Sequence, residues 1–225
     1  MDIKSGEAMK KGKLNQKGYT LIELIVTILI TGIIAVIISV FVTVSRNAYE
    51  AVRQEAVLQE EAQMADSYIG DIAIEAYQFS TASFTIGSDN YQVLNITAPD
   101  PDYISGERHP YYFIILWEET TQTLRFCKVK NDAKLEANGT YTLPVDSKLK
   151  FLSGTSNLDY ATMLSAGNLN IINNPRALLA QYVTNMVVVL PNVSTGSDMA
   201  KITLRFSYHD RDYVLTRNIK GRNMR

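Results

Sequence analysis

The chain has 225 residues, of which 46% are hydrophobic, and 22 Lys and Arg side chains against 23 Asp and Glu give a formal net charge of −1. This composition excludes a disordered chain, and the length allows one membrane anchor and one globular domain with a core of ordinary size. The charge balance indicates no overall affinity for polyanions. The single cysteine, Cys127, excludes an internal disulfide, and we interpret it as a small buried hydrophobic side chain.

The first predicted element is an apolar segment with one carboxylate near its start. After Glu23, the 22 residues 24–45 carry no charge, and at about 1.5 Å per helical residue they span the ~30 Å hydrocarbon core of a bilayer. We predict a membrane-spanning helix over residues 21–44, beginning at Leu21 and ending at Val44. Because an ionisable group in hydrocarbon is costly, Glu23 requires a partner or a function.

Positive charge precedes this segment and predicts its orientation. Five lysines face only Asp2 and Glu7 in residues 1–18, whereas residues 46–55 carry charges of both signs. By the positive-inside rule the N-terminus stays in the cytoplasm and the rest of the chain is exported. The alternative is a removable secretory signal. The apolar run is longer than the usual signal core and no small-x-small cleavage site closes it, which favours a retained anchor.

Residues 17–24, Lys-Gly-Tyr-Thr-Leu-Ile-Glu-Leu, resemble the processing and assembly motif of type IV pilins and type II secretion pseudopilins. The resemblance implies that prepilin peptidase cuts between Gly18 and Tyr19, that Tyr19 becomes the N-methylated first residue, and that Glu23 meets the α-amino group of a neighbouring subunit during assembly. A glycine also suits an extended backbone in a protease cleft, and Thr20 suits the N-cap of the following helix. The alternative for Glu23 is a side chain that only reaches the lipid headgroups.

The helix is predicted to continue beyond the membrane. Apolar residues recur at alternating steps of three and four from residue 48 to 79, interrupted only by Glu55, and the first proline is Pro99. This pattern predicts an amphipathic continuation, so that one helix of about 60 residues starts at Thr20. Many pilins have a kinking proline in the membrane segment. Here Val40 occupies that position, and Gly32 is the only helix breaker inside the run.

Strand and turn residues follow the helix. Six segments are rich in β-branched and aromatic residues, namely 91–96, 111–117, 123–129, 182–190, 202–208 and 213–219. The last two should form a hairpin with a turn at 209–212. That register sets Phe206 opposite Leu215 and Ile202 opposite Ile219, with a face that is apolar apart from Arg217. Residues 132–180 suggest short strands, loops and room for a small helix.

The predicted fold class is α+β, a long N-terminal helix packed on an antiparallel β-sheet head, as the resemblance to pilins also implies. The expected organisation is a cleaved cytoplasmic leader at 1–18, the transmembrane half of the helix at 19–45, its amphipathic half at 46–80, and an exported β-rich head at 81–225.

No catalytic or metal-binding constellation is apparent, so we expect no enzyme, metal or cofactor. His109 and His209 are the only histidines and lie a hundred positions apart, without zinc or nucleophile spacing. Some pseudopilins bind calcium, but Asp89, Asp100 and Asp102 match no ligand spacing that we recognise.

A locally basic tail is the other charged feature. The DNA-uptake alternative would use its side chains as phosphate contacts, but no aromatic residues interleave with them to stack bases, so nucleic-acid binding is not favoured. These side chains are Arg205, Arg211, Arg217, Lys220, Arg222 and Arg225.

Two classes of function follow. The first is a minor pilin-like structural subunit that acts in initiation or at the tip. The head is larger than that of many major pilins, Tyr19 replaces the commoner Phe, and the order of elements loosely resembles minor subunits of the pilin W and pseudopilin J kind.

The partners of such a subunit would be prepilin peptidase, other pilin or pseudopilin subunits and the inner-membrane assembly platform. It would be a single-pass cytoplasmic membrane protein, N-terminus in and C-terminus out, that moves to a surface pilus or pseudopilus. The second class is a membrane-anchored exported binding protein, including a DNA-binding uptake pilin, that is not built into a fibre. The sequence leaves open a pilus, a secretion pseudopilus or a competence system.

Overall fold

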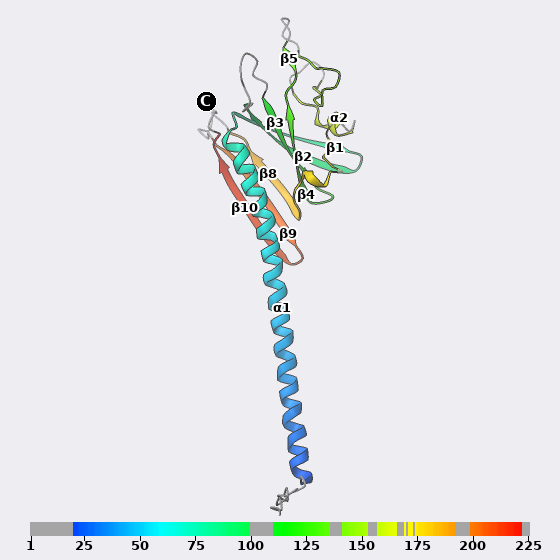
Figure 1. Ribbon diagram of the computed structural model, residues 1–225, viewed down its shortest axis with the longest axis vertical. Coiled ribbons are helices and arrows are strands. Elements are labelled where there is room, and N and C mark those ends of the chain that lie inside the picture. The colour runs from blue at the N-terminus through cyan, green and yellow to red at the C-terminus, as the bar shows by residue number, and fades with distance from the viewer. Residues whose placement is uncertain are drawn as a thin grey trace, which may run out of the picture. The chain divides into compact units, whose positions relative to one another are not determined.

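In the computed structural model, a long helix is the first element of the described part of the chain, and strands follow it (Figure 1). The structure describes residues 20–99, 110–135, 141–152, 157–165, 169, 171–172, 174–191 and 199–221. The chain divides into two compact units, Met1–Glu50 and Ala51–Arg225. Helix α1 (Leu21–Ile74) has 54 residues, and its first part belongs to one unit and its last part to the other.

The α+β prediction is confirmed, with the strands in antiparallel sheets. A five-stranded sheet has the order β1-β2-β3-β4-β7, a three-stranded sheet the order β10-β9-β8, and β5 pairs with β6. The elements after α1 are β1 (Gln78–Ile86), β2 (Asp89–Ala98), β3 (Tyr111–Glu118), β4 (Thr123–Lys130), β5 (Lys134–Leu135), β6 (Tyr141–Thr142), α2 (Tyr160–Ser165), the short 3-10 helix η1 (Pro175–Ala177), β7 (Leu178–Ala180), β8 (Val183–Val189), β9 (Ala200–Tyr208) and β10 (Arg211–Ile219). All six predicted strands are present, and 132–180 holds the short strands and small helix expected there.

The helix ends earlier than predicted, and strand β1 was not predicted. The last turn of α1 tightens, since Glu75 N donates to Ile72 O and Ala76 N to Ala73 O. Tyr77 N then donates to Thr97 O of β2 at 3.0 Å, which starts the pairing with the sheet. The helix was predicted to continue to residue 79 because Ala76 and Phe79 extend its apolar repeat. Both side chains are buried like the helical positions before them, but the backbone there is no longer helical.

In the unit that begins at Ala51, one core joins α1 to both larger sheets. Small and apolar side chains of α1 meet Leu94 and Ile115 from the five-stranded sheet and Leu204 and Phe206 from β9, all buried. Figure 1 shows β8, β9 and β10 beside this part of α1. The other face of the five-stranded sheet has a second core with α2, which includes Met163. Burial on both faces explains the nearly continuous burial along β2.

The C-terminal hairpin is present, but its predicted register was wrong by two residues. Phe206 lies opposite Tyr213 and Ile202 opposite Arg217, because only the two residues His209 and Asp210 connect the strands. His209 adopts a φ of 52°, which allows this short connection. Because side chains alternate with a period of two, a two-residue shift keeps the same face toward the core.

The apolar face of this hairpin contains one arginine, which α1 accommodates. Arg217 Nη1 contacts Asp66 Oδ2 at 2.6 Å and donates to Asp66 O at 3.0 Å. A Cβ built on Gly70 would overlap the Arg217 guanidinium, so the missing side chain at Gly70 makes room for it. The two side chains of the ion pair are about one-third exposed, which suits a pair at the rim of the core.

Replacing Gly70 by Ala should therefore destabilise the protein, although the same substitution usually stabilises a helix. Ala in place of Gly normally stabilises a helix by up to ~1 kcal/mol. Here we expect the free energy of unfolding to fall by about 1–2 kcal/mol, because the methyl group displaces the guanidinium. In an Arg217→Leu background the same substitution should stabilise. Chemical denaturation of the full chain in detergent micelles measures both values, with exposed Ser67→Ala as the control. Equal losses in the two backgrounds would exclude Arg217 as the cause.

Candidate functional site

The predicted assembly residue, Glu23, lies in the first turn of α1, where it forms a capping box with Thr20. Leu24 N donates to Thr20 O at 3.2 Å, which makes Thr20 the N-cap. Glu23 Oε2 accepts from Thr20 N and from Thr20 Oγ1, both at 2.9 Å, while Glu23 N donates weakly to Thr20 Oγ1 at 3.4 Å. The box satisfies N–H groups that a helix start otherwise leaves unpaired. The predicted N-cap is confirmed, and the carboxylate has a local partner that the sequence analysis did not name.

After the capping box, threonine hydroxyl groups of the apolar part of α1 bond to backbone carbonyls one turn earlier. Thr27 Oγ1 donates to Glu23 O at 2.7 Å, and Thr31 Oγ1 to Thr27 O at 2.8 Å. Thr43 Oγ1 similarly donates to Ser39 O at 2.9 Å. Such bonds let hydroxyl groups face hydrocarbon without leaving a donor unpaired.

The apolar side chains of residues 21–44 are not buried by any other part of the chain that the structure describes. The large hydrophobic side chains of residues 21–44 are 48% to 78% exposed. By length and composition α1 can cross a membrane, and apolar exposure on this scale marks a surface for lipid or for other chains. A Cβ built on Gly32 meets nothing within 4 Å, so close packing inside this chain does not account for the glycine.

The processing residues Gly18 and Tyr19 lie outside the described residues. The capping box nevertheless begins one position after Tyr19. A cut between Gly18 and Tyr19 would thus separate the leader just before the helix starts.

The other candidates from the sequence form no common site among the described residues. Burial raises the pKa of the half-buried Cys127 thiol to about 12, so it is protonated at neutral pH. Asp89 accepts from Thr120 Oγ1 at 2.9 Å, while Asp100, Asp102 and His109 fall outside the described part. Within that part no group of three or more His, Cys, Asp or Glu side chains could hold a metal ion.

Among the described residues, the basic C-terminal side chains do not all share one surface. Arg217 faces α1 and pairs with Asp66, so it is not available to phosphates in the way the DNA-uptake alternative required. Arg205 and Arg211 are exposed on β9 and β10. Arg222 and Arg225 lie outside the described residues.

The comparisons with known proteins agree with the N-terminal motif. A family model described as the prokaryotic N-terminal methylation motif matches residues 13–39. The matched segment contains Gly18, Tyr19, the capping box and more than half of the apolar run. No curated protein and no solved structure matches the chain.

Proposed function

The chain carries the N-terminal methylation motif of the type IV pilin and pseudopilin superfamily, and on this premise we propose that it is a minor pilin-like structural subunit. Prepilin peptidase cuts it between Gly18 and Tyr19, Tyr19 is N-methylated, and α1 stays in the product as anchor and assembly element. The observation that carries the proposal is the coincidence of the motif, the capping box at Thr20 and the uncharged helix that follows.

Glu23 has two successive partners in this proposal. In the unassembled subunit its carboxylate accepts hydrogen bonds from Thr20 N and Thr20 Oγ1, both at 2.9 Å. In the fibre it pairs with the α-amino group of Tyr19 of a neighbouring subunit. Both charges are unfavourable in hydrocarbon alone, and the pair neutralises them. The pairing therefore selects the register between subunits more than it strengthens the fibre.

The membrane and the fibre offer two environments for the same surface. The exposed apolar side chains of residues 21–44 contact lipid before assembly and the corresponding helices of other subunits afterwards. The inner-membrane platform extracts the subunit, and its exported part reaches the cell surface or the pseudopilus. The part of the chain after α1 is large and carries two large sheets. This size supports a position at the tip or in initiation, because a subunit in such a position is not repeated along the shaft.

Processing gives the direct test of the proposal. Mass spectrometry of the N-terminal peptide from the membrane fraction should find chains that start at Tyr19 with a methylated α-amine. Gly18→Val should accumulate as the full-length chain, because a branched side chain obstructs the extended backbone at the cut. Gly12→Val, in the same leader, is the matched control and should be processed normally.

Two results would reject the proposal. One is an intact leader in wild-type cells that contain an active prepilin peptidase. The other is a cut beyond Ser45, which would remove the apolar segment and identify it as a secretory signal.

A further inference from the structure

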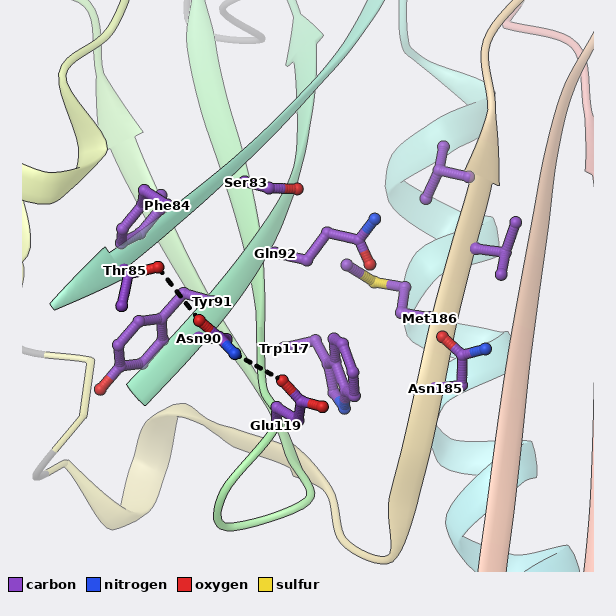
Figure 2. A pocket seen from close by; sticks show the side chains of 12 residues that line it. Ser83, Phe84, Thr85, Asn90, Tyr91, Gln92, Trp117, Glu119, Asn185 and Met186 are labelled. Atoms are coloured by element: carbon purple, nitrogen blue, oxygen red, sulfur yellow. Dashed lines mark hydrogen bonds between the residues drawn. The ribbon is translucent and has the colours of Figure 1, made fainter. Parts of the chain in front are cut away.

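A groove of about 570 Å³ opens between the five-stranded sheet and strand β8, within the unit that begins at Ala51. Figure 2 shows Gln92 and Trp117 on one side and Asn185 and Met186 on the other. Trp117 Nε1 donates to Val183 O at 2.8 Å, which fixes the start of β8 against β3.

One wall of the groove is a strand edge without a partner strand in the described part of the chain. In the three-stranded sheet β8 pairs only with β9. Ser207 N donates to Tyr182 O, so the odd positions of β9 direct their backbone groups toward β8. Val187, which lies opposite Thr203, then bonds to β9. Because bonded and non-bonded positions alternate, the N–H and C=O groups of Met186 and Val188 point away from β9.

Apart from a register shift between Val183 and Asn185, strand β8 lacks the charged and proline residues that protect an edge. Edge strands commonly carry charges or proline that prevent pairing with another chain. Strand β10, the other edge of the same sheet, contains Arg211, Asp212 and Arg217, whereas β8 reads Val-Thr-Asn-Met-Val-Val-Val. Val187 and Val189 are 46% and 55% exposed. An open edge with exposed valines is the surface to which an extended segment adds.

The groove also has a fixed negative charge. Glu119 Oε2 accepts from Asn90 Nδ2 at 2.9 Å, and Asn90 Oδ1 accepts from Thr85 Oγ1 at 3.0 Å (Figure 2). Glu119 is the only charged side chain among the described residues that line the groove. Its exposed carboxylate is held by these contacts, so it favours an occupant with a cationic side chain.

We propose that this groove binds an extended polypeptide segment that carries a Lys or Arg side chain. The segment adds to β8 as a further strand through the backbone groups of Met186 and Val188, and its cationic side chain reaches Glu119. From Asn185 to Val188 the edge offers about 10 Å, at roughly 3.3 Å per residue, so it engages a short stretch of the partner. The proposal does not depend on assembly into a fibre.

Trp117 is the single tryptophan of the chain and reports on the groove directly. The full chain in detergent micelles is titrated with the acetylated and amidated peptide Thr-Val-Lys-Val-Thr, and with the same peptide carrying Glu in place of Lys. We expect a saturable change of Trp117 emission with the Lys peptide. The Glu peptide should bind about tenfold more weakly, because its carboxylate meets that of Glu119.

Two variants separate the backbone contact from the charge. Val188→Pro removes an outward N–H, a change that an edge strand tolerates, and should weaken binding of the Lys peptide at least about tenfold. Val188→Thr keeps the N–H and should bind normally. Glu119→Gln should bring the two peptides within about twofold of each other, while Glu60→Gln, on the exposed face of α1, should leave the tenfold preference intact.

Three results would overturn the proposal: no saturable response to the Lys peptide, equal affinities of the two peptides for the wild-type chain, or unchanged binding by a folded Val188→Pro variant. If far-UV circular dichroism shows that Val188→Pro does not fold, hydrogen exchange replaces it. The Lys peptide must then slow hydrogen exchange at the amides of Met186 and Val188. Unchanged exchange at these amides would overturn the proposal.

Discussion

Replacing Glu23 by Ala is expected to reduce incorporation of the subunit into sheared fibres or pseudopili by about a hundredfold or more, while the protein still accumulates in the membrane. In the proposed fibre the variant leaves the α-amine of a neighbouring Tyr19 without a counter-charge among apolar helices, and an uncompensated buried charge costs about 3–5 kcal/mol. Membrane insertion should not suffer, because Ala is more compatible with hydrocarbon than Glu. Quantitative immunoblots of the fibre and membrane fractions measure both effects.

Two further variants distinguish the charge of Glu23 from its role in the capping box. Glu23→Gln keeps an acceptor for the Thr20 N–H, since Gln also serves at this position of a capping box, but it removes the charge. Thr20→Ala removes the cap hydroxyl that bonds to Glu23 Oε2 and keeps the charge. If intersubunit pairing is the function, Glu23→Gln should fail like Glu23→Ala, and Thr20→Ala should assemble. Normal assembly of Glu23→Gln would mean that helix capping is sufficient and that the charge pairing is wrong.

The first part of helix α1 could be predicted from sequence because its constraints are local. An uncharged stretch of 22 residues has few alternatives to a membrane-spanning helix. Thr20 and Glu23 are three positions apart, which is the spacing of a capping box, so the local partner of Glu23 could also have been predicted.

The head was harder to predict because tertiary contacts decide its details. Ala76 and Phe79 continue the apolar repeat of α1, but a backbone bond from Tyr77 N to Thr97 O, twenty positions away, directs the chain into β1. Between Phe79 and Phe84 strand β1 contains only Ser, Thr and Ala, so it has a weaker strand signal than the strands rich in Val and Ile. In the C-terminal hairpin, Arg217 was recognised as the exception on an apolar face. Its partner Asp66 lies 151 positions earlier, which no local pattern reveals.

Truncation of Phe206 should have the largest effect on the stability of the head. Phe206 is fully buried in the core that joins α1 to both larger sheets, and it lies opposite Tyr213 on one side and Val183 on the other. Removing a buried aromatic side chain leaves a cavity that costs about 3–5 kcal/mol. That loss is a large share of the roughly 5–15 kcal/mol that stabilises a typical domain. We therefore expect Phe206→Ala to lower the free energy of unfolding by this amount in chemical denaturation of the full chain in micelles.

The matched control is Val214→Ala on the adjacent strand β10. Val214 is 51% exposed, so its truncation should change the free energy of unfolding by no more than about 0.5 kcal/mol.

The two variants also separate folding from processing in the proposed function. In that proposal cleavage at Gly18 takes place on the cytoplasmic side and involves no residue of the head, so Phe206→Ala should still yield chains that start at Tyr19, although fewer of them persist and assemble. A loss below about 1 kcal/mol for Phe206→Ala would show that the core around β9 does not hold α1 against the sheets as described.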